Sequence, residues 1–244
     1  KVKTSPCLPA IIWSMAIVEI KNWCISAEGQ SISCIKSTLN SIKPILLIGG
    51  VHGDEPEGVE LACRTLDWLK TETSKNPTAV YPWIVIPCLN PDGYRKNQRV
   101  NANGVDLNRN YPSRDWTKSY KEPRYFPGPS PGSELEIKSL TTLIAETQPL
   151  LIIHCHSWHP CIVYAGDAAR TYATALSETT GYELKNDIGY PTPGSLSSYA
   201  WGDHRIPVIC IEEKEKIDRQ LVWPNFSAGM KQIFLKNGDG VSRA

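Results

Sequence analysis

The stretch Ile45-Leu-Leu-Ile-Gly-Gly-Val-His-Gly-Asp-Glu55 runs from four consecutive apolar residues through a glycine pair into polar residues. The apolar run predicts a buried strand, and Gly49-Gly50 predicts a tight loop at its end. On either side of it, short apolar strands are predicted at 83–86, 150–153 and 207–211, and helices at 59–70, 133–148, 171–180 and 225–236. This alternation predicts an α/β domain with a twisted, mixed but largely parallel sheet and helices on both faces.

Two connections between these elements have distinctive composition. Asn90-Pro-Asp-Gly93 predicts a turn after the second strand, and residues 111–132, rich in proline, tyrosine and charge, predict a long functional loop. The helix at 133–148 is expected to begin with a capping box formed by Ser133 and Glu136.

Length and charge limit the possible partners. The chain has 244 residues, 41% of them hydrophobic, and we expect residues 1–244 to form a single domain. With 26 basic and 25 acidic residues the formal net charge is +1, so no long-range field attracts nucleic acid or an anionic membrane. No transmembrane helix is predicted, and the broken apolar stretch at 1–20 is expected to be a strand or an irregular segment. The sequence does not fix an oligomeric state.

Eight scattered cysteines, without a Cys-x-x-Cys pair, favour a cytoplasmic location. Several lie inside apolar runs, as Cys88 and Cys210 do, which is typical of buried thiols. A domain of this size does not need disulfides, so we expect a reducing compartment.

His52 and Glu55 have the types and spacing of metal ligands. Three positions apart at the start of a helix, they project to the same side, and Zn²⁺ accepts both imidazole nitrogen and carboxylate oxygen. A catalytic zinc also needs a third protein ligand and an open position for water. The alternative is that Asp54, Glu55 and Glu57 only stabilise the start of the helix through its dipole.

The third ligand is expected in the cluster His154-Cys-His156-Ser-Trp-His159, at the end of the strand 150–153. His154 and His156 share one face of that strand, and His156 is nearer the strand end, where ligands bind in folds of this class. The spacing favours His156 and leaves His154 and His159 as alternatives. The fifth histidine, His204, is expected in a surface loop.

A carboxylate follows the apolar strand 207–211. Strand alternation puts Glu212 and Glu213 on opposite faces, and a carboxylate after four apolar residues is costly unless it is paired or functional. We therefore expect one of the two to be functional, and the other to join the solvated charged run 213–216.

Arginines and amides gather after the second predicted strand, in the segments 95–99 and 106–110. A guanidinium group can bind a carboxylate through two hydrogen bonds or stabilise an oxyanion. A solvated charged loop is the alternative, and for Lys96 we favour it.

Together these motifs resemble the M14 family of metallocarboxypeptidases, and within it the bacterial murein peptide amidases. The most specific motif is RVNANGVDLNRNYP (99–112). The other matching segments are GGVHGDE (49–55), NPDGY (90–94), PGSELE (131–136), HSW (156–158), GYPTPGSLSSYA (189–200) and PVICIE (207–212).

The resemblance implies the catalytic roles. His52, Glu55 and His156 match the ligands of one zinc ion per chain, which favours His156 over the other histidines. Glu212 matches the general base, and Arg99 matches the arginine that polarises the scissile carbonyl.

It also implies the contacts to substrate. Asn108 and Arg109 match the pair that holds the terminal carboxylate, and Tyr190 falls near a mobile-loop tyrosine. The chain departs from the family pattern at His154-Cys155, where no additional histidine is expected, and at Glu213-Lys214, where an apolar residue and a proline are usual.

The implied reaction is zinc-dependent hydrolysis of an amide bond next to a carboxylate-bearing residue. The resemblance narrows the substrate to the γ-D-glutamyl–meso-diaminopimelate bond of a small, free murein peptide, cleaved during cell-wall recycling. Ser195, Ser197, Ser198 and Asp203 are candidates to contact the second amino-carboxylate centre of diaminopimelate.

Three alternatives remain at this point. A broader zinc carboxypeptidase would use the same site on other C-terminal residues. A succinylglutamate desuccinylase or aspartoacylase-like deacylase shares the His-x-x-Glu motif and a shorter DLNR, and NPDGY, NANGV and PGSL argue against it. A binding module that has lost its metal is disfavoured because all matching ligands and Glu212 are present.

Overall fold

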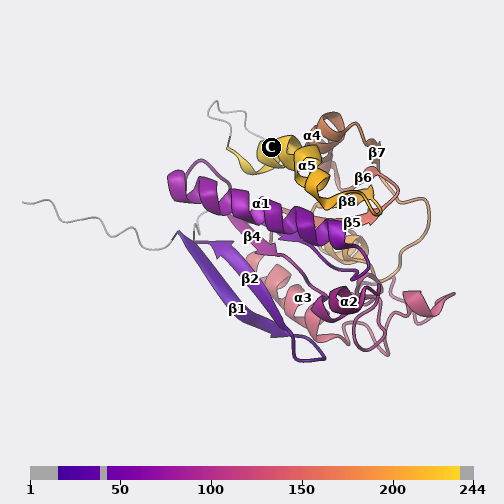
Figure 1. The fold of residues 1–244 in the computed structure, drawn as a ribbon. Helices are drawn as coiled ribbons and strands as arrows, with labels where there is room; N and C mark the ends of the chain where they lie inside the picture. Colours follow the sequence, from indigo (N-terminus) through magenta and orange to yellow (C-terminus); the bar gives the residue numbers. More distant parts are fainter. Residues whose placement is uncertain (1–15, 39–42, 237–244) are drawn as a thin grey trace, which may run out of the picture.

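A mixed β-sheet forms the centre of the protein in a computed structural model that describes residues 16–38 and 43–236 (Figure 1). Its eight strands lie in the order β1-β2-β4-β3-β5-β8-β6-β7. Their bounds are β1 (Ile17–Ile25), β2 (Ser31–Ser37), β3 (Ile45–Ile48), β4 (Trp83–Ile86), β5 (Leu151–Trp158), β6 (Cys161–Ala165), β7 (Glu183–Lys185) and β8 (Val208–Lys214). The central strands β4, β3, β5 and β8 run parallel, so their carboxyl ends meet at one edge.

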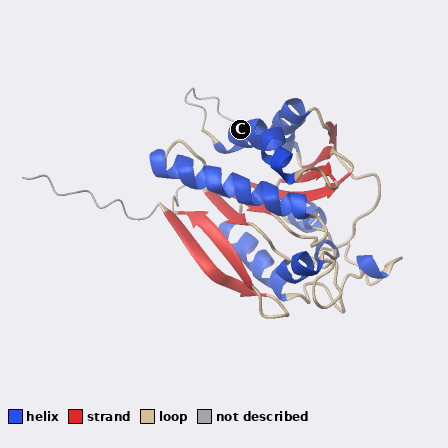
Figure 2. Cartoon of the chain, viewed as in Figure 1, coloured by secondary structure: helices blue, strands red, loops and turns tan. Residues whose placement is uncertain are grey.

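Helices cover both faces of this sheet, as the sequence predicts (Figure 2). The α-helices are α1 (Pro56–Lys75), α2 (Pro91–Lys96), α3 (Leu135–Thr147), α4 (Asp167–Thr180) and α5 (Arg219–Phe234). Short helical turns are η1 (Leu107–Arg109), η2 (Pro123–Tyr125) and the π-helical η3 (Ser198–Asp203). Residues of α1, α4 and α5 pack on one face, and residues of α3 and η3 pack on the other.

The alternation of side chains in β3 shows why its run is apolar throughout. Ile45 and Leu47 belong to the core under α1, α4 and α5, whereas Leu46 and Ile48 belong to the core over α3. All four are fully buried. Because each such side chain stabilises the fold by roughly 1.5–3 kcal/mol, a strand with two buried faces has no position for a polar residue.

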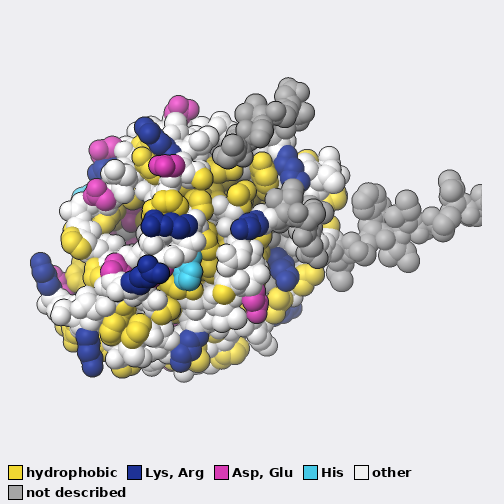
Figure 3. All heavy atoms as spheres, turned by 180° about the vertical axis from the view of Figure 1, so that it is seen from behind, with side chains coloured by type: hydrophobic (Ala, Val, Ile, Leu, Met, Phe, Trp, Pro, Cys, Tyr) yellow, Lys and Arg dark blue, Asp and Glu magenta, His cyan; other side chains and the backbone are white. Residues whose placement is uncertain are grey.

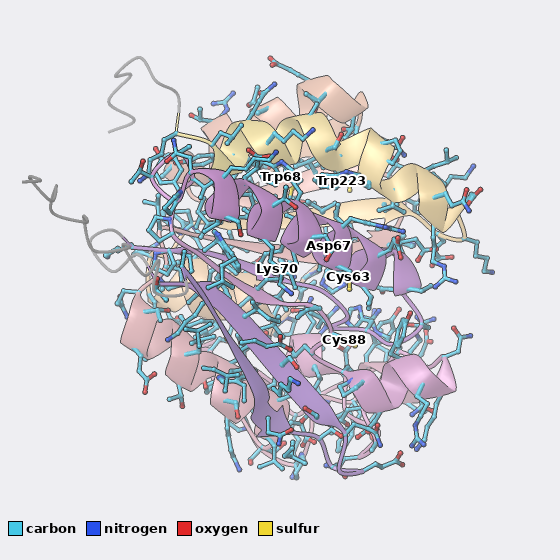
Figure 4. All side chains as sticks on the ribbon, turned by 60° about the vertical axis from the view of Figure 1, so that its left-hand side comes forward. Cys63, Asp67, Trp68, Lys70, Cys88 and Trp223 are labelled. Atoms are coloured by element: carbon cyan, nitrogen blue, oxygen red, sulfur yellow. The ribbon has the colours of Figure 1, made fainter. Side chains whose placement is uncertain are left out.

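Helices α1 and α5, which cover the same face of the sheet, also contact each other. Trp68 of α1 and Trp223 of α5 lie side by side with ring centroids 6.3 Å apart (Figure 4). Helix α5 begins at Arg219 rather than at the expected residue 225, although Pro224 lies inside it. The carboxylate of Asp218 accepts a hydrogen bond from the Gln220 amide, and this cap starts the helix ahead of the proline.

Several predicted elements differ from the observed ones. The antiparallel hairpin β1–β2 and the strands β6 and β7 were not predicted; β1 includes the end of the stretch 1–20, whose first 15 residues lie outside the described part of the chain. The predicted turn at Asn90 is the start of α2, where Asn90 accepts a hydrogen bond from the Gly93 amide at 2.9 Å. The four central strands and the helices α1, α3 and α4 are confirmed, with helix ends shifted by several residues.

The capping box expected at the start of the helix predicted at 133–148 is wrong. Helix α3 begins at Leu135, and its N-cap residue Glu134 makes no side-chain hydrogen bond to the helix. Ser133 instead donates its hydroxyl proton to the Glu134 carboxylate at 2.6 Å, and Glu134 accepts from Asn101 at 2.7 Å. This part of the sequence therefore anchors the loop that precedes the helix.

The surface carries both signs of charge. Basic and acidic side chains are interspersed over the face shown in Figure 3, in line with the net charge of +1. No helix in the described part of the chain is long and apolar enough to cross a membrane. The seven cysteines within residues 16–38 and 43–236 are all free.

Candidate active site

A cavity of about 360 Å³ lies beyond the carboxyl ends of the central strands. This is the edge at which ligands bind in open α/β sheets. Eight residues were singled out from the sequence as site residues, and all eight line this cavity: His52, Glu55, Arg99, Asn108, Arg109, His156, Tyr190 and Glu212. The fold thus brings together side chains that are up to 160 positions apart in the chain.

Two histidines and one glutamate converge at the bottom of the cavity. His52 Nδ1 lies 2.8 Å from Glu55 Oε1, His156 Nδ1 lies 2.7 Å from Glu55 Oε2, and the two Nδ1 atoms are 3.0 Å apart. All three side chains are buried. Glu55 occupies the N-cap position of α1 but makes no capping hydrogen bond. Its carboxylate therefore contacts the two histidines and does not cap the helix.

The loop that carries His52 is held by a close backbone contact. A Cβ atom added to Gly53 would lie 2.0 Å from the carbonyl carbon of Gly93 in α2. The side chain of Asn90 donates hydrogen bonds to the carbonyl oxygens of Val51 and Arg99, at 3.4 and 3.2 Å. These contacts explain why the His-Gly-Asp-Glu and Asn-Pro-Asp-Gly-Tyr motifs occur together: each fixes the backbone of the other.

Electrostatics favours a cation among these residues. Burial alone would raise the pKa of Glu55, but His52 and His156 hold it well below its ordinary value, so the carboxylate is ionised. A ligand atom from each of His52, Glu55 and His156 lies within 4.8 Å of the other two. Two imidazoles and a carboxylate are a donor set that zinc accepts in catalytic sites. The residues present fit a zinc ion.

Asp106 supports the site from behind. Its Oδ1 atom lies 3.1 Å from His52 Nε2, and its Oδ2 atom accepts a hydrogen bond from Arg99 Nε at 2.9 Å. Although Asp106 is fully buried, Arg99 and His52 keep its pKa well below the usual range. A carboxylate in this position orients the ring of His52 with Nδ1 toward the cavity.

His154 lies beside the ligand candidate that the sequence favoured. Its Nδ1 atom is 2.9 Å from His156 Nε2, on the side away from Glu55 and His52. Burial and the neighbouring histidines hold the pKa of His154 well below the ordinary value, which keeps the ring neutral. The third histidine of the cluster, His159, is exposed.

Three arginines of the segment 99–125 form an arginine-rich wall of the cavity. Arg99, Arg109 and Arg124 place their guanidinium carbons 5.3, 5.9 and 5.5 Å from the ring centre of Tyr125. Arg99 is paired with Asp106, whereas Arg109 forms no ion pair with an acidic side chain in the described part of the chain. Arg109 is also buried and lines the cavity, and no carboxylate of the described residues lies within ion-pair distance of its guanidinium group.

Asn108 and Arg109 adjoin each other in η1. Asn108 Oδ1 accepts a hydrogen bond from the Leu196 amide at 3.0 Å, which ties η1 to the segment that follows Tyr190. The carbonyl oxygen of Asn108 accepts from Arg109 Nη1 at 2.7 Å. The amide and the guanidinium group are therefore held in a fixed relation on one wall.

Glu212 also lines the cavity, and one of its carboxylate oxygens is free. Its Oε1 accepts a weak hydrogen bond from the Cys210 thiol at 3.5 Å, and its Oε2 has no hydrogen-bond partner among the described residues. Burial, together with the negative charge of Glu55, raises the pKa of Glu212 to about 8. A carboxylate in this setting is a stronger base than usual, as a proton acceptor requires.

The expectation that Glu213 lies on a solvated face is wrong. Glu213 is 1% exposed and accepts hydrogen bonds from the Tyr182 hydroxyl and from Asn225 Nδ2. It faces the helical layer of α4 and α5, on the side of the sheet opposite to Glu212. The charged run begins at Lys214, which is exposed.

The segment between β7 and β8 forms the rim of the cavity. Tyr190 is 47% exposed and contacts Trp158 edge to face, with ring centroids 6.0 Å apart. Of the polar residues considered for substrate contact, Ser195 and Ser197 line the cavity. Ser198 and Asp203 instead bind protein groups, the Asp115 carboxylate and the Arg114 amide. His204 is exposed, as expected.

Sequence reasoning missed three contributors to the site. Asp106 and Tyr125 act through residues 7 to 54 positions away, so no local pattern marks them. Glu57 was expected only to favour the helix start; it accepts hydrogen bonds from the Ser157 hydroxyl at 2.7 Å and the Lys216 amide at 2.8 Å. It thereby joins α1 to the ends of β5 and β8.

The fold and the converging histidines and glutamate are those of a zinc metallopeptidase. The family model described as zinc carboxypeptidase, Peptidase_M14, matches residues 15–225. The chain therefore belongs to the zinc carboxypeptidase family, a family of hydrolytic enzymes, as the sequence motifs indicate. The family implies zinc as the metal.

Individual relatives narrow the comparison. Murein peptide amidase A of Escherichia coli K12 is 34% identical over 166 residues, which are 63% of this chain and 64% of that protein, a little under two thirds of its length. The Vibrio campbellii murein peptide amidase A is 28% identical over 179 residues, 68% of each chain.

Solved structures give the same grouping. The crystal structure of murein-tripeptide amidase from Escherichia coli O157 superposes with a TM-score of 0.74 at 25% identity, covering 94% of this chain and 96% of the other. Carboxypeptidase A from Helicoverpa armigera has a TM-score of 0.75 at 19% identity, covering 89% and 67%. The latter likeness is one of fold.

Proposed function

We propose that this protein is a zinc-dependent amidase that hydrolyses the γ-D-glutamyl–meso-diaminopimelate bond of free murein peptides in the cytoplasm. The observation that carries the proposal is the presence of two complementary groups in the lining of one cavity. Arg109 offers a buried guanidinium group without an acidic partner among the described residues, and Glu212 offers a free carboxylate oxygen. Together they suit an amide bond that lies next to a carboxylate.

His52, Glu55 and His156 would hold the zinc ion, since their ligand atoms converge and Glu55 is ionised. When bound, zinc supplies Lewis-acid chemistry, which activates water and stabilises negative charge on oxygen. The remaining steps are assigned to side chains of this chain alone.

Substrate binding is assigned to the arginine wall. Arg109 donates two hydrogen bonds to the terminal carboxylate of the substrate, and the amide of Asn108 supports it. The N–H groups of Arg99 that are not engaged by Asp106 and Glu55 donate to the carbonyl oxygen of the scissile bond. Tyr190, exposed on the rim, would cover the bound peptide.

Glu212 carries the proton transfers. Its carboxylate takes a proton from the attacking water as the new C–O bond forms at the scissile carbonyl carbon. It then delivers that proton to the leaving nitrogen as the C–N bond breaks, so the products are a carboxylic acid, which ionises at neutral pH, and an amine. Burial raises the pKa of Glu212, which makes its carboxylate a stronger base than usual toward the proton of the attacking water.

The test is direct measurement of product release from three substrates. The zinc-loaded protein is incubated with L-Ala-γ-D-Glu-meso-diaminopimelate, with an ordinary peptide ending in an apolar or basic residue, and with an N-acyl amino acid. Release of diaminopimelate from the first alone supports the proposal. Trimming of the ordinary peptide with the first untouched would indicate a broader carboxypeptidase, and cleavage of only the N-acyl amino acid would indicate a deacylase.

A further inference from the structure

The two candidate histidine ligands are supported in different ways. His52 has Asp106 at its Nε2 atom, 3.1 Å away, and His156 has His154 at its Nε2 atom, 2.9 Å away. In both rings Nδ1 faces Glu55. The chain thus places a carboxylate behind one histidine and an imidazole behind the other.

The position of the imidazole proton decides whether His156 can bind a metal. A neutral ring carries one proton, and the ligating nitrogen must offer its lone pair. Nδ1 of His156 points to Glu55 and His52, so for this atom to offer its lone pair to a metal the ring proton must reside on Nε2. That N–H group is buried and requires an acceptor, and His154 Nδ1 is within hydrogen-bond distance with the two rings nearly perpendicular, at 88°.

Fold stability does not account for His154. When its Nδ1 accepts a proton from His156, its own proton lies on Nε2, and this atom is buried without a hydrogen-bond partner in the described part of the chain. A buried N–H group without a partner destabilises a fold. An apolar residue would satisfy the packing of β5 better, so the requirement for an acceptor at Nδ1 is what explains a histidine here.

We propose that His154 is a positioning residue that accepts the Nε2 proton of His156 and so holds the Nδ1 lone pair of His156 toward the metal. This inference rests on the assignment of His52, Glu55 and His156 as zinc ligands. It applies to a histidine that the family pattern does not call for. Partners of this kind typically contribute a factor of roughly 10–100 to metal affinity.

The first experiment compares zinc dissociation constants, measured by competition with a chelating dye. His154→Leu removes the acceptor and is expected to weaken zinc binding roughly 10–100-fold. His154→Asn keeps an acceptor oxygen on the same side-chain carbon and is expected to restore most of the affinity. His159→Leu, which changes an exposed histidine close to the same strand, is the matched control and should bind zinc as the parent protein does.

A structural role would give a different set of results. The unfolding free energy of the metal-free His154→Leu protein is expected to stay close to that of the parent protein, because the loss of the unpartnered Nε2–H group of His154 offsets the loss of the partner of His156 Nε2. Loss of stability in the metal-free state together with unchanged zinc affinity would overturn the inference. Equal weakening by His154→Leu and His154→Asn would overturn it as well.

The parent protein provides a second measurement that needs no variant. In the ¹⁵N-labelled zinc protein, two-bond ¹H–¹⁵N correlations should show the proton of His156 on Nε2; a proton on Nδ1 would overturn the inference. The ligand atoms of His154, His156 and Cys210 also converge, so His154 could instead be a metal ligand. Two zinc ions per chain in the parent protein, with one of them lost in Cys210→Ser, would show this and would overturn the inference. Retention of zinc by His156→Ala would contradict the ligand assignment itself.

Discussion

His156 and Glu212 are paired in register on the adjacent parallel strands β5 and β8. Paired residues on neighbouring strands direct their side chains to the same face of a sheet, so the ligand candidate and the base candidate enter the cavity together. The neighbouring pair, Ser157 and Glu213, faces the other way: Ser157 donates a hydrogen bond to Glu57 of α1, and Glu213 accepts one from Asn225 of α5. A shift of one residue in this register would exchange the free carboxylate of Glu212 for the paired carboxylate of Glu213.

This register gives a first prediction about the two glutamates. Glu212→Gln removes the proton acceptor from an otherwise intact site, so turnover is expected to fall roughly 10²–10⁴-fold with zinc content unchanged. Glu213→Gln is the matched control. It changes a carboxylate bound to Tyr182 and Asn225, so it should alter stability more than turnover per folded molecule. The measurements are the turnover and the zinc content of both variants. Near-normal turnover of Glu212→Gln would refute the assignment of Glu212 as the general base.

The second prediction concerns the metal. His156→Ala removes one of three ligands and leaves Glu55 with a single histidine neighbour, so the variant is expected to lose both zinc and activity. His204→Ala, a change at an exposed histidine, should retain one zinc ion per chain. Elemental analysis after dialysis measures the outcome. A His154→Ala protein without zinc beside a His156→Ala protein with zinc would show that the ligand is His154.

The parts of the structure that the sequence predicts are those with a local signature. The strand at 45–48 is apolar on both faces, and its glycine pair, His52 and Glu55 follow within seven residues, so fold and site are encoded together. The edge hairpin β1–β2 has no such signature. Six of the nine residues of β1 are exposed, and its lysine and glutamate residues hide the strand pattern.

Side chains that depend on distant partners were beyond sequence reasoning. Asp106 was not singled out from the segment 106–110 because its partner His52 lies 54 positions away. Glu213 was assigned to solvent because Lys214 and further charges follow it, whereas its partner Tyr182 comes from a different element. Local charge patterns do not reveal burial when the neutralising partner is brought in by the tertiary fold.

The third prediction concerns the carboxylate-binding wall. Arg109→Lys keeps the charge but cannot form the bidentate pair of hydrogen bonds to a carboxylate. For a substrate with a free terminal carboxylate, kcat/KM is therefore expected to fall about 10- to 100-fold, which corresponds to the loss of one charge-assisted hydrogen bond. The loss should appear mainly in KM. The same substrate with an amidated terminus is the control: it should be poor for both proteins and show little difference between them. An equal loss on both substrates would remove Arg109 from carboxylate recognition.

The last prediction concerns pH and stability at Glu136, away from the cavity. This side chain lies in the first turn of α3, is 1% exposed, and has an Oε1 atom without a hydrogen-bond partner among the described residues. Burial, with the charge of Glu134 adding to it, raises the pKa of Glu136 from 4.5 to about 6. The protonated form is therefore the one that the folded protein favours.

The sign of the effect on stability follows from this direction. The stabilisation from a protonated Glu136 is fully present below pH 4.5 and is lost as the pH rises through about 6, because the folded protein must then ionise a buried carboxylate. Glu136→Gln keeps a neutral side chain of the same size at every pH. At pH 8 the unfolding free energy of the variant is expected to exceed that of the parent protein by up to about 2 kcal/mol, and below pH 4.5 the two should converge. Chemical denaturation of both proteins, metal-free, at several pH values measures the difference. A difference that does not change with pH would show that Glu136 titrates in the folded protein as it does in the unfolded chain.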